Sequence, residues 1–231
     1  MAVSRAPYTV RRSDRARRAR IQVTADGVEV IVPRRLPMAV VEPFVESKRG
    51  WIDRTLLRMR AAEAERPRPL LADGGEVPLL GERLTLRVRV EPARRRDHVA
   101  RRGDELAVAV SEPGAQAIRA ALERWYRGQA RVEVGRRLDA AVARVGQSYA
   151  GLQIRGQRTR WASCSSKGAM SFNWRLLLAP PEILDYVVEH EVAHLDVHDH
   201  SPRFWALLAE RSPDCREHER WLRVNGQTLS L

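Results

Sequence analysis

Residues 187–205 read Val-Val-Glu-His-Glu-Val-Ala-His-Leu-Asp-Val-His-Asp-His-Ser-Pro-Arg-Phe-Trp. Within this stretch, His190, Glu191 and His194 form the pattern H-E-x-x-H. Side chains four residues apart lie one turn apart on the same face of a helix, so both imidazoles can reach one metal ion. Glu191 stands beside them and can act on a water molecule as a general base. This combination is typical of metal-dependent hydrolases.

The surrounding sequence favours a helix that carries this pattern. Pro180-Pro181-Glu182 is a helix start signal, with proline and an acidic residue in the first turn. Apolar residues follow at roughly helical spacing, at Ile183, Val187, Val188 and Leu195. The alternative is a polar helix with solvated histidines or one buried histidine. A metal site is the better interpretation, because three further histidines follow His190 within eleven residues, namely His194, His198 and His200.

A catalytic zinc ion usually has three protein ligands and one open position, so a third ligand is needed. His198 continues the four-residue spacing, but it would lie about 12 Å along the helix axis from His190 at ~1.5 Å per residue. Three ligands in line along one helix do not easily form a tetrahedral site. His200 becomes usable if the chain bends after His194, and Pro202 favours such a bend because proline disfavours helix in the residue before it. We therefore prefer His200, with His198, Glu210 and Glu217 as the remaining candidates.

The spacing of the three histidines equals that of the metzincin pattern H-E-x-x-H-x-x-G-x-x-H, but Val197 stands where that pattern has its bend glycine. A closer resemblance extends over nearly the whole chain, which resembles the YgjP-like metallopeptidase family. That family is similar to SprT-like zinc proteases in its metal helix. The motifs that carry the resemblance are Arg160–Ser165, Phe172–Leu176, Pro181–Leu195, Asp199-His200-Ser201 and Phe204-Trp205, together with Trp51-Ile52, Leu79-Leu80-Gly81 and Trp125-Tyr126-Arg127.

The resemblance implies that zinc is bound by His190, His194 and His200 and that Glu191 is the general base. It also implies that the strand before the metal helix, Met170 to Leu176, is the sheet edge that pairs with an extended peptide. The chain departs from the family pattern at two positions. Ala162 replaces the usual glycine, which could alter a tight turn, and Asp199 replaces the usual asparagine before His200.

The pattern of apolar residues predicts an α+β fold in two parts. Residues 1–112 form a β-rich N-terminal region with one helix, and residues 113–231 form a zincin-like metal-binding catalytic domain. In the first part we expect strands within 22–32, at 84–90 and on either side of a hairpin turn at 102–104, and a helix at 37–64. In the second part we expect helices at 115–145, 181–195 and 202–209, and strands at 152–155 and 169–178.

The composition sets wider bounds on the chain. Its 231 residues, 44% of them hydrophobic, suffice for one large or two small cores. Without an apolar run of ~18 residues or a secretory signal, we expect a cytoplasmic protein with no membrane helix. Two cysteines in unrelated contexts indicate no disulfide framework, and we expect Cys164 to be a small buried residue. The net charge of +12 permits nucleic-acid binding, although the arginine clusters at 15–20 and 94–96 are more typical of solvated loops.

We expect hydrolysis of a peptide or protein by water, with Glu191 taking the proton and returning it to the leaving amine. Candidate donors to the carbonyl oxygen are Tyr186, His198, Arg175 and Arg203. Asp196 and Asp199 are candidates to orient the ligand imidazoles, and Trp161 and Trp174 either line the cleft or pack in the core.

Two alternatives differ in function. The first is a metal-dependent hydrolase of nucleotide phosphoanhydrides, which the positive charge favours. The second is a non-catalytic nucleic-acid-binding protein with a structural zinc. A histidine-only cluster argues against the second, because structural zinc sites usually contain cysteines.

Overall fold

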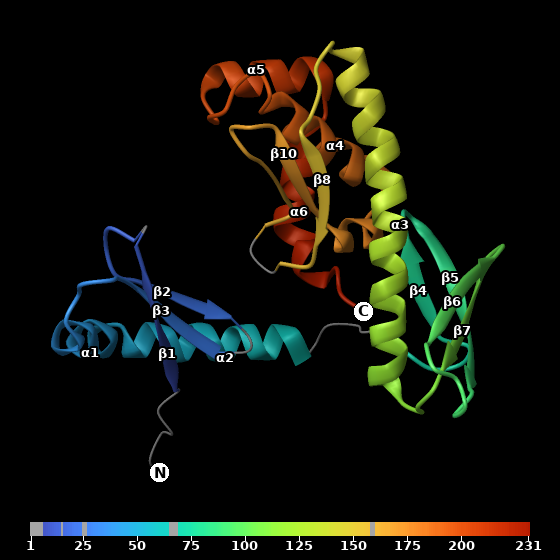
Figure 1. Cartoon of the computed structure of the whole chain (residues 1–231). Helices are drawn as coiled ribbons and strands as arrows, with labels where there is room; N and C mark the ends of the chain where they lie inside the picture. Colours follow the sequence, from blue (N-terminus) through green and yellow to red (C-terminus); the bar gives the residue numbers. More distant parts are fainter. Residues whose placement is uncertain (1–6, 15, 25–26, 65–68, 158–159) are drawn as a thin grey trace. The chain divides into compact units, whose positions relative to one another are not determined.

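The computed structural model describes residues 7–14, 16–24, 27–64, 69–157 and 160–231 (Figure 1). The fold is mixed α+β, as expected from the sequence. The chain divides into two compact units, residues 1–67 and 68–231. Each unit has its own hydrophobic core, and each is described by itself below.

Unit 1 consists of a three-stranded sheet and two helices. Its strands are β1 (Tyr8–Ser13), β2 (Arg20–Thr24) and β3 (Gly27–Pro33), in the order β1-β3-β2, with β1 parallel and β2 antiparallel to β3. The single helix expected at 37–64 is instead two helices, α1 (Met38–Ser47) and α2 (Arg49–Ala64). They are separated at Lys48, whose ψ of 2° departs from helical geometry. Residues from the sheet and both helices share the core, among them Val28, Val30, Val41, Val45 and Ile52.

Unit 2 begins with a four-stranded sheet. It contains β4 (Glu76–Leu79), β5 (Glu82–Val90), β6 (His98–Arg102) and β7 (Glu105–Val110) in the order β4-β5-β7-β6. The alternating pattern in β5 gives buried Leu84 and Leu86 between outward-facing residues, which confirms a half-buried strand. The hairpin between β6 and β7 is also confirmed, and its turn requires the positive φ of 63° that Gly103 adopts.

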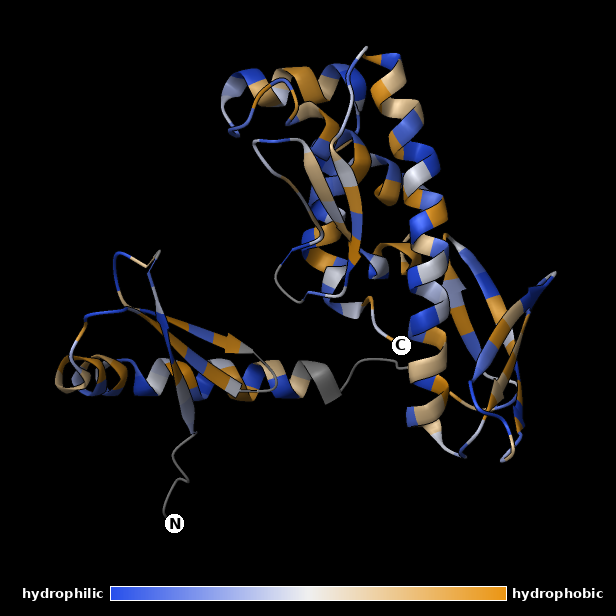
Figure 2. Ribbon diagram, viewed as in Figure 1, coloured by the Kyte–Doolittle hydropathy of each residue, from blue (hydrophilic) through white to orange (hydrophobic). Residues whose placement is uncertain are grey.

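The helix α3 (Ala115–Arg144) runs past this sheet and past the elements that carry the histidines (Figure 1). Polar and apolar positions alternate around it (Figure 2). Its buried side includes Ile118, Leu122, Tyr126 and Leu138. The Tyr126 hydroxyl donates a hydrogen bond to the Pro78 carbonyl oxygen at 2.5 Å, which joins α3 to β4.

A second sheet precedes the metal helix. It has the order β8-β10-β9 and contains β8 (Gly151–Arg155), β9 (Ala162–Cys164) and β10 (Ala169–Asn173). The strand expected at 169–178 ends at Asn173, where the 3-10 helix η1 (Trp174–Leu178) begins. The Asn173 side chain causes this change locally, because it accepts a hydrogen bond from the Arg175 N–H at 3.1 Å. The chain then continues through α4 (Pro181–Ala193), α5 (Pro202–Arg211), α6 (Cys215–Asn225) and a short 3-10 helix, η2 (Gly226–Thr228).

The boundary between the units differs from the one expected at 112/113, which lies inside unit 2 between β7 and α3. The reason is that both sheets of unit 2 pack on α3 and contribute to one core, so the first sheet cannot be separated from the helices that follow. Leu86 and Val108 of the first sheet belong to the same cluster as Phe172 and Val188. No helix of the described residues is both long and apolar enough to cross a membrane.

Candidate metal centre

The H-E-x-x-H pattern lies at the end of α4. The helix begins as expected, with Pro181 in its first turn and Glu182 as an acidic residue beside it. His190 and Glu191 occupy the last turn, and His194 is the residue that caps the C-terminus. The C-terminal end of α4 therefore carries all three side chains.

Three histidines converge there. The ligand atoms of His190, His194 and His200 all lie within 4.8 Å of one another, and the Nε2 atoms of His190 and His200 are 3.0 Å apart. The Nδ1–H of His194 donates to the Val197 carbonyl oxygen at 3.0 Å, which leaves its Nε2 as the ligand atom. The chain bends between His194 and α5, as Pro202 led us to expect.

The electrostatics of this cluster suit a metal cation. Burial, together with the neighbouring His194 and His200, lowers the pKa of His190 to about 3. Burial also lowers the pKa of His194. These imidazoles are therefore neutral and keep a lone pair at neutral pH, which is the form that binds metals. Together with His200 they provide three imidazole nitrogen atoms at one place, which matches the donor set of a catalytic zinc site.

Glu191 is buried beside the histidines, with 5% of its surface exposed. Burial raises the pKa of Glu191 to about 8, and a hydrogen bond from the Cys164 backbone N–H partly offsets this effect. The Oε2 atom of Glu191 is buried and has no hydrogen-bond partner among the described residues. The Cys164 N–H thus holds the carboxyl group in place, while Oε2 can accept a hydrogen bond from another molecule.

Phe204 on α5 supports all three imidazoles, a role that the sequence did not predict. It is fully buried, and its ring centroid lies 4.9, 4.6 and 4.8 Å from those of His190, His194 and His200. The ring is stacked on His194. Its position two residues after Pro202 was a usable signal, because an aromatic residue in the first turn of α5 faces back toward the bend.

The other ligand candidates lie elsewhere. His198, Glu210 and Glu217 are exposed, and none belongs to the cluster found among the described residues. Asp196 and Asp199, the candidates for orienting the imidazoles, bond through their carboxylates to other partners. Asp196 accepts hydrogen bonds from Gln147 and Arg211, and Asp199 accepts one from the Ser201 N–H.

The donor candidates differ in their surroundings. Tyr186 is buried on α4, with its ring centroid 5.9 Å from that of His190, and burial raises the pKa of its hydroxyl. Arg175 donates to the Gly156 carbonyl oxygen at 3.2 Å and stacks over Trp174, while Arg203 is exposed. Trp174 is buried and belongs to the core, and Trp161 packs partly buried against it.

The predicted sheet edge is wrong. The strand β10, which contains Met170, is central because it pairs with β8 on one side and β9 on the other. The strand β9 lies at the edge instead and contacts α4. Ala162 begins β9 without a positive φ, so the alanine is compatible with its backbone. Cys164 is only partly buried, and its backbone N–H is the group that reaches Glu191.

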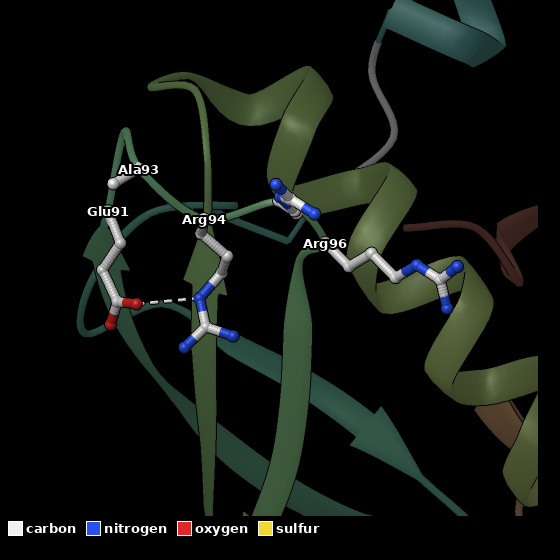
Figure 3. Close-up of a pocket in the computed structure, with 5 residues that line it drawn as sticks. Glu91, Ala93, Arg94 and Arg96 are labelled. Atoms are coloured by element: carbon white, nitrogen blue, oxygen red, sulfur yellow. Dashed lines mark hydrogen bonds and ion pairs between the residues drawn. The ribbon is translucent and has the colours of Figure 1, made fainter.

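A separate hollow of about 740 Å³ lies in the loop between β5 and β6 (Figure 3). It is lined by Glu91, Ala93, Arg94, Arg95 and Arg96, and Arg94 pairs with Glu91 at 2.8 Å. None of its lining residues belongs to the histidine cluster. The hollow is therefore distinct from the candidate metal centre.

Comparison with known proteins identifies relatives. A family model described as YgjP-like, metallopeptidase domain, matches residues 17–225, which include all three histidines and Glu191. Among solved structures, the metallopeptidase zymogen abylysin of Pyrococcus abyssi is 26% identical with a TM-score of 0.36, over 41% of this chain and 93% of that chain. The zymogen jannalysin of Methanocaldococcus jannaschii is 19% identical with a TM-score of 0.35, over 41% and 95%. No curated protein sequence matches the chain.

Proposed function

The chain belongs to the YgjP-like metallopeptidase family, and from that membership we propose that it is a zinc-dependent peptidase. In this proposal His190, His194 and His200 hold the zinc ion and Glu191 is the general base. The observation that carries the proposal is the convergence of three histidine ligand atoms beside a buried carboxylate. A peptide or protein is the substrate class that the family implies.

A zinc ion bound by the three histidines would supply a Lewis acid and lower the pKa of a water molecule toward ~7. Glu191 contributes the proton transfers. Its unpartnered Oε2 accepts the proton of the attacking water, and the carboxyl group then returns this proton to the leaving amine. Burial raises the pKa of Glu191 to about 8 in the metal-free site, and a cation bound beside it would favour the carboxylate form that accepts a proton.

The edge strand β9 is the site that we propose for the substrate backbone. Main-chain hydrogen bonds from Asn173 to Trp161 at 2.7 Å and from Ser165 to Ala169 at 2.9 Å direct alternate residues toward β10. The intervening Ala162 and Cys164 direct their main chain away from β10. The Cys164 N–H bonds to Glu191, so an added strand would bond to Ala162 and to the Cys164 carbonyl oxygen. An extended peptide can add there as a further strand. Because the Cys164 N–H reaches Glu191, such a peptide would lie beside the general base.

The test begins with protein purified without added metal, for which elemental analysis should find about one zinc per chain. Glu191→Gln should keep the zinc and lose cleavage of an unfolded protein. His200→Ala should lose the zinc, and His198→Ala is the matched control that should keep it. Full cleavage by Glu191→Gln, or the reverse pattern of zinc loss, would contradict these roles.

The same preparations distinguish the alternatives from the sequence. If the protein hydrolyses nucleoside triphosphates but does not cleave protein, its function is phosphoanhydride hydrolysis and the peptidase proposal is wrong. Steeply salt-dependent binding of nucleic acid that Glu191→Gln leaves unchanged, again without cleavage, would indicate a binding protein with a structural zinc.

A further inference from the structure

The third histidine depends on a loop, whereas the first two depend on a helix. His190 and His194 are fixed by α4 and its C-terminal cap. His200 comes from the segment 195–201, which has no regular secondary structure and connects α4 to α5. Within the segment, the Val197 N–H donates to the Ala193 carbonyl oxygen at 3.0 Å. That bond fixes the start of the loop but not its position relative to the rest of unit 2.

Asp196 connects this loop to two other parts of unit 2. One carboxylate oxygen accepts a hydrogen bond from Gln147 Nε2 at 2.8 Å, just beyond the end of α3. The other accepts one from Arg211 Nη2 at 2.7 Å, at the last residue of α5. The Arg211 side chain is only 13% exposed, so solvent screens this ion pair less than a fully exposed one.

We propose that Asp196, through Gln147 and Arg211, holds the loop in the conformation that presents His200 and thereby sets the metal affinity. This role depends on the three histidines being the metal ligands, as in the proposed function. Asp196 is a positioning residue, because its carboxylate bonds to Gln147 and Arg211 rather than to an imidazole. By ordering the loop when the chain folds, the interactions remove an entropic cost that metal binding would otherwise carry.

The primary test measures the zinc dissociation constant of the full chain by competition with a chromophoric chelator. Asp196→Ala should weaken zinc binding by about 10- to 100-fold, the range typical of residues that support metal ligands. Asp185→Ala is the matched control, since Asp185 also pairs at 2.7 Å with an arginine that is 13% exposed, Arg137. That pair joins α3 to α4, away from the loop, and its loss should leave zinc affinity unchanged.

Further variants separate positioning from a general loss of stability. Arg211→Ala should weaken zinc binding, and Arg211→Lys should keep part of the affinity that Arg211→Ala loses. The double variant Asp196→Ala/Arg211→Ala should bind zinc no more weakly than whichever single alanine variant binds it more weakly. Gln147→Ala removes one hydrogen bond while keeping the ion pair, and serves if Asp196→Ala does not fold.

Equal zinc affinity in Asp196→Ala, Gln147→Ala and Asp185→Ala would overturn the positioning role. Additive losses from Asp196 and Arg211 would overturn it as well. A wrong assignment of the three histidine ligands would give a different result: His200→Ala would then bind zinc as well as the natural chain does.

Discussion

The protonation of Glu191 makes a specific prediction about the stability of the metal-free protein. Burial raises the pKa of this carboxyl group from 4.5 to about 8. Between these two pH values the folded protein binds a proton that the unfolded chain releases. The free energy of unfolding therefore falls as the pH rises through this range.

His190 opposes this effect over part of the range. Burial lowers the pKa of His190 from 6.5 to about 3, so between these values the unfolded chain binds the additional proton and stability rises with pH. Above pH 6.5 this contribution, and the similar one from His194, whose pKa burial also lowers, soon levels off, while that of Glu191 remains. From pH 6.5 to pH 8, at about 1.4 kcal/mol per pH unit, Glu191 lowers the free energy of unfolding by about 2 kcal/mol.

Glu191→Gln should abolish this loss, because the amide does not titrate. We would treat both proteins with a chelator and compare urea unfolding at pH 6.5 and pH 8. Glu182→Gln, an exposed position in the first turn of the same helix, is the control and should keep the loss. An equal loss of stability in Glu191→Gln would refute the assignment of the titration to this carboxyl group.

Two further substitutions probe the surroundings of the histidines. Phe204→Ala should lower the free energy of unfolding by about 3–5 kcal/mol in urea, because it empties a fully buried ring position; a loss below 1 kcal/mol would mean that the ring does not support the cluster. Tyr186→Phe should keep its zinc while kcat/KM for a peptide falls by about 10²- to 10³-fold, the usual effect of removing one donor to the oxyanion. An unchanged kcat/KM would exclude the Tyr186 hydroxyl from this role.

The metal helix could be predicted from the sequence because its information is local. The helical period alone brings His190 and His194 to one face, and Pro181 marks where the helix begins. The bend that returns His200 to the other two histidines was also predictable, since Pro202 starts a new helix directly after it. The ligand and base roles of these residues stay predictions.

The order of strands could not be predicted in the same way, because pairing is not local. The strand β9 spans only Ala162–Cys164, which is too short for a recognisable alternation. The prediction that β10 is the edge of the sheet rested on the family resemblance, and so short a strand gives no sequence pattern that would correct it. The boundary at 112/113 has a similar origin, because a sequence pattern does not reveal that both sheets of unit 2 pack on α3.

Some contributions to the site are invisible in the sequence for a chemical reason. The group that holds Glu191 is the backbone N–H of Cys164, which almost any residue in that strand would supply. The contact of Asp196 with Arg211 joins residues fifteen positions apart through a salt bridge. A list of candidate side chains therefore includes the reacting groups but omits part of what orients them.

The burial of Glu191 and His190 is better explained by a function of these side chains than by a contribution to folding. A carboxyl group without a hydrogen-bond partner for Oε2 lowers stability at neutral pH, and so does a buried His190 Nδ1 without a partner among the described residues. An apolar residue at either position would avoid these costs. Their retention beside two further histidines is what a cation site with a proton acceptor requires, since neutral imidazoles and an available carboxylate oxygen become favourable only when a cation is bound.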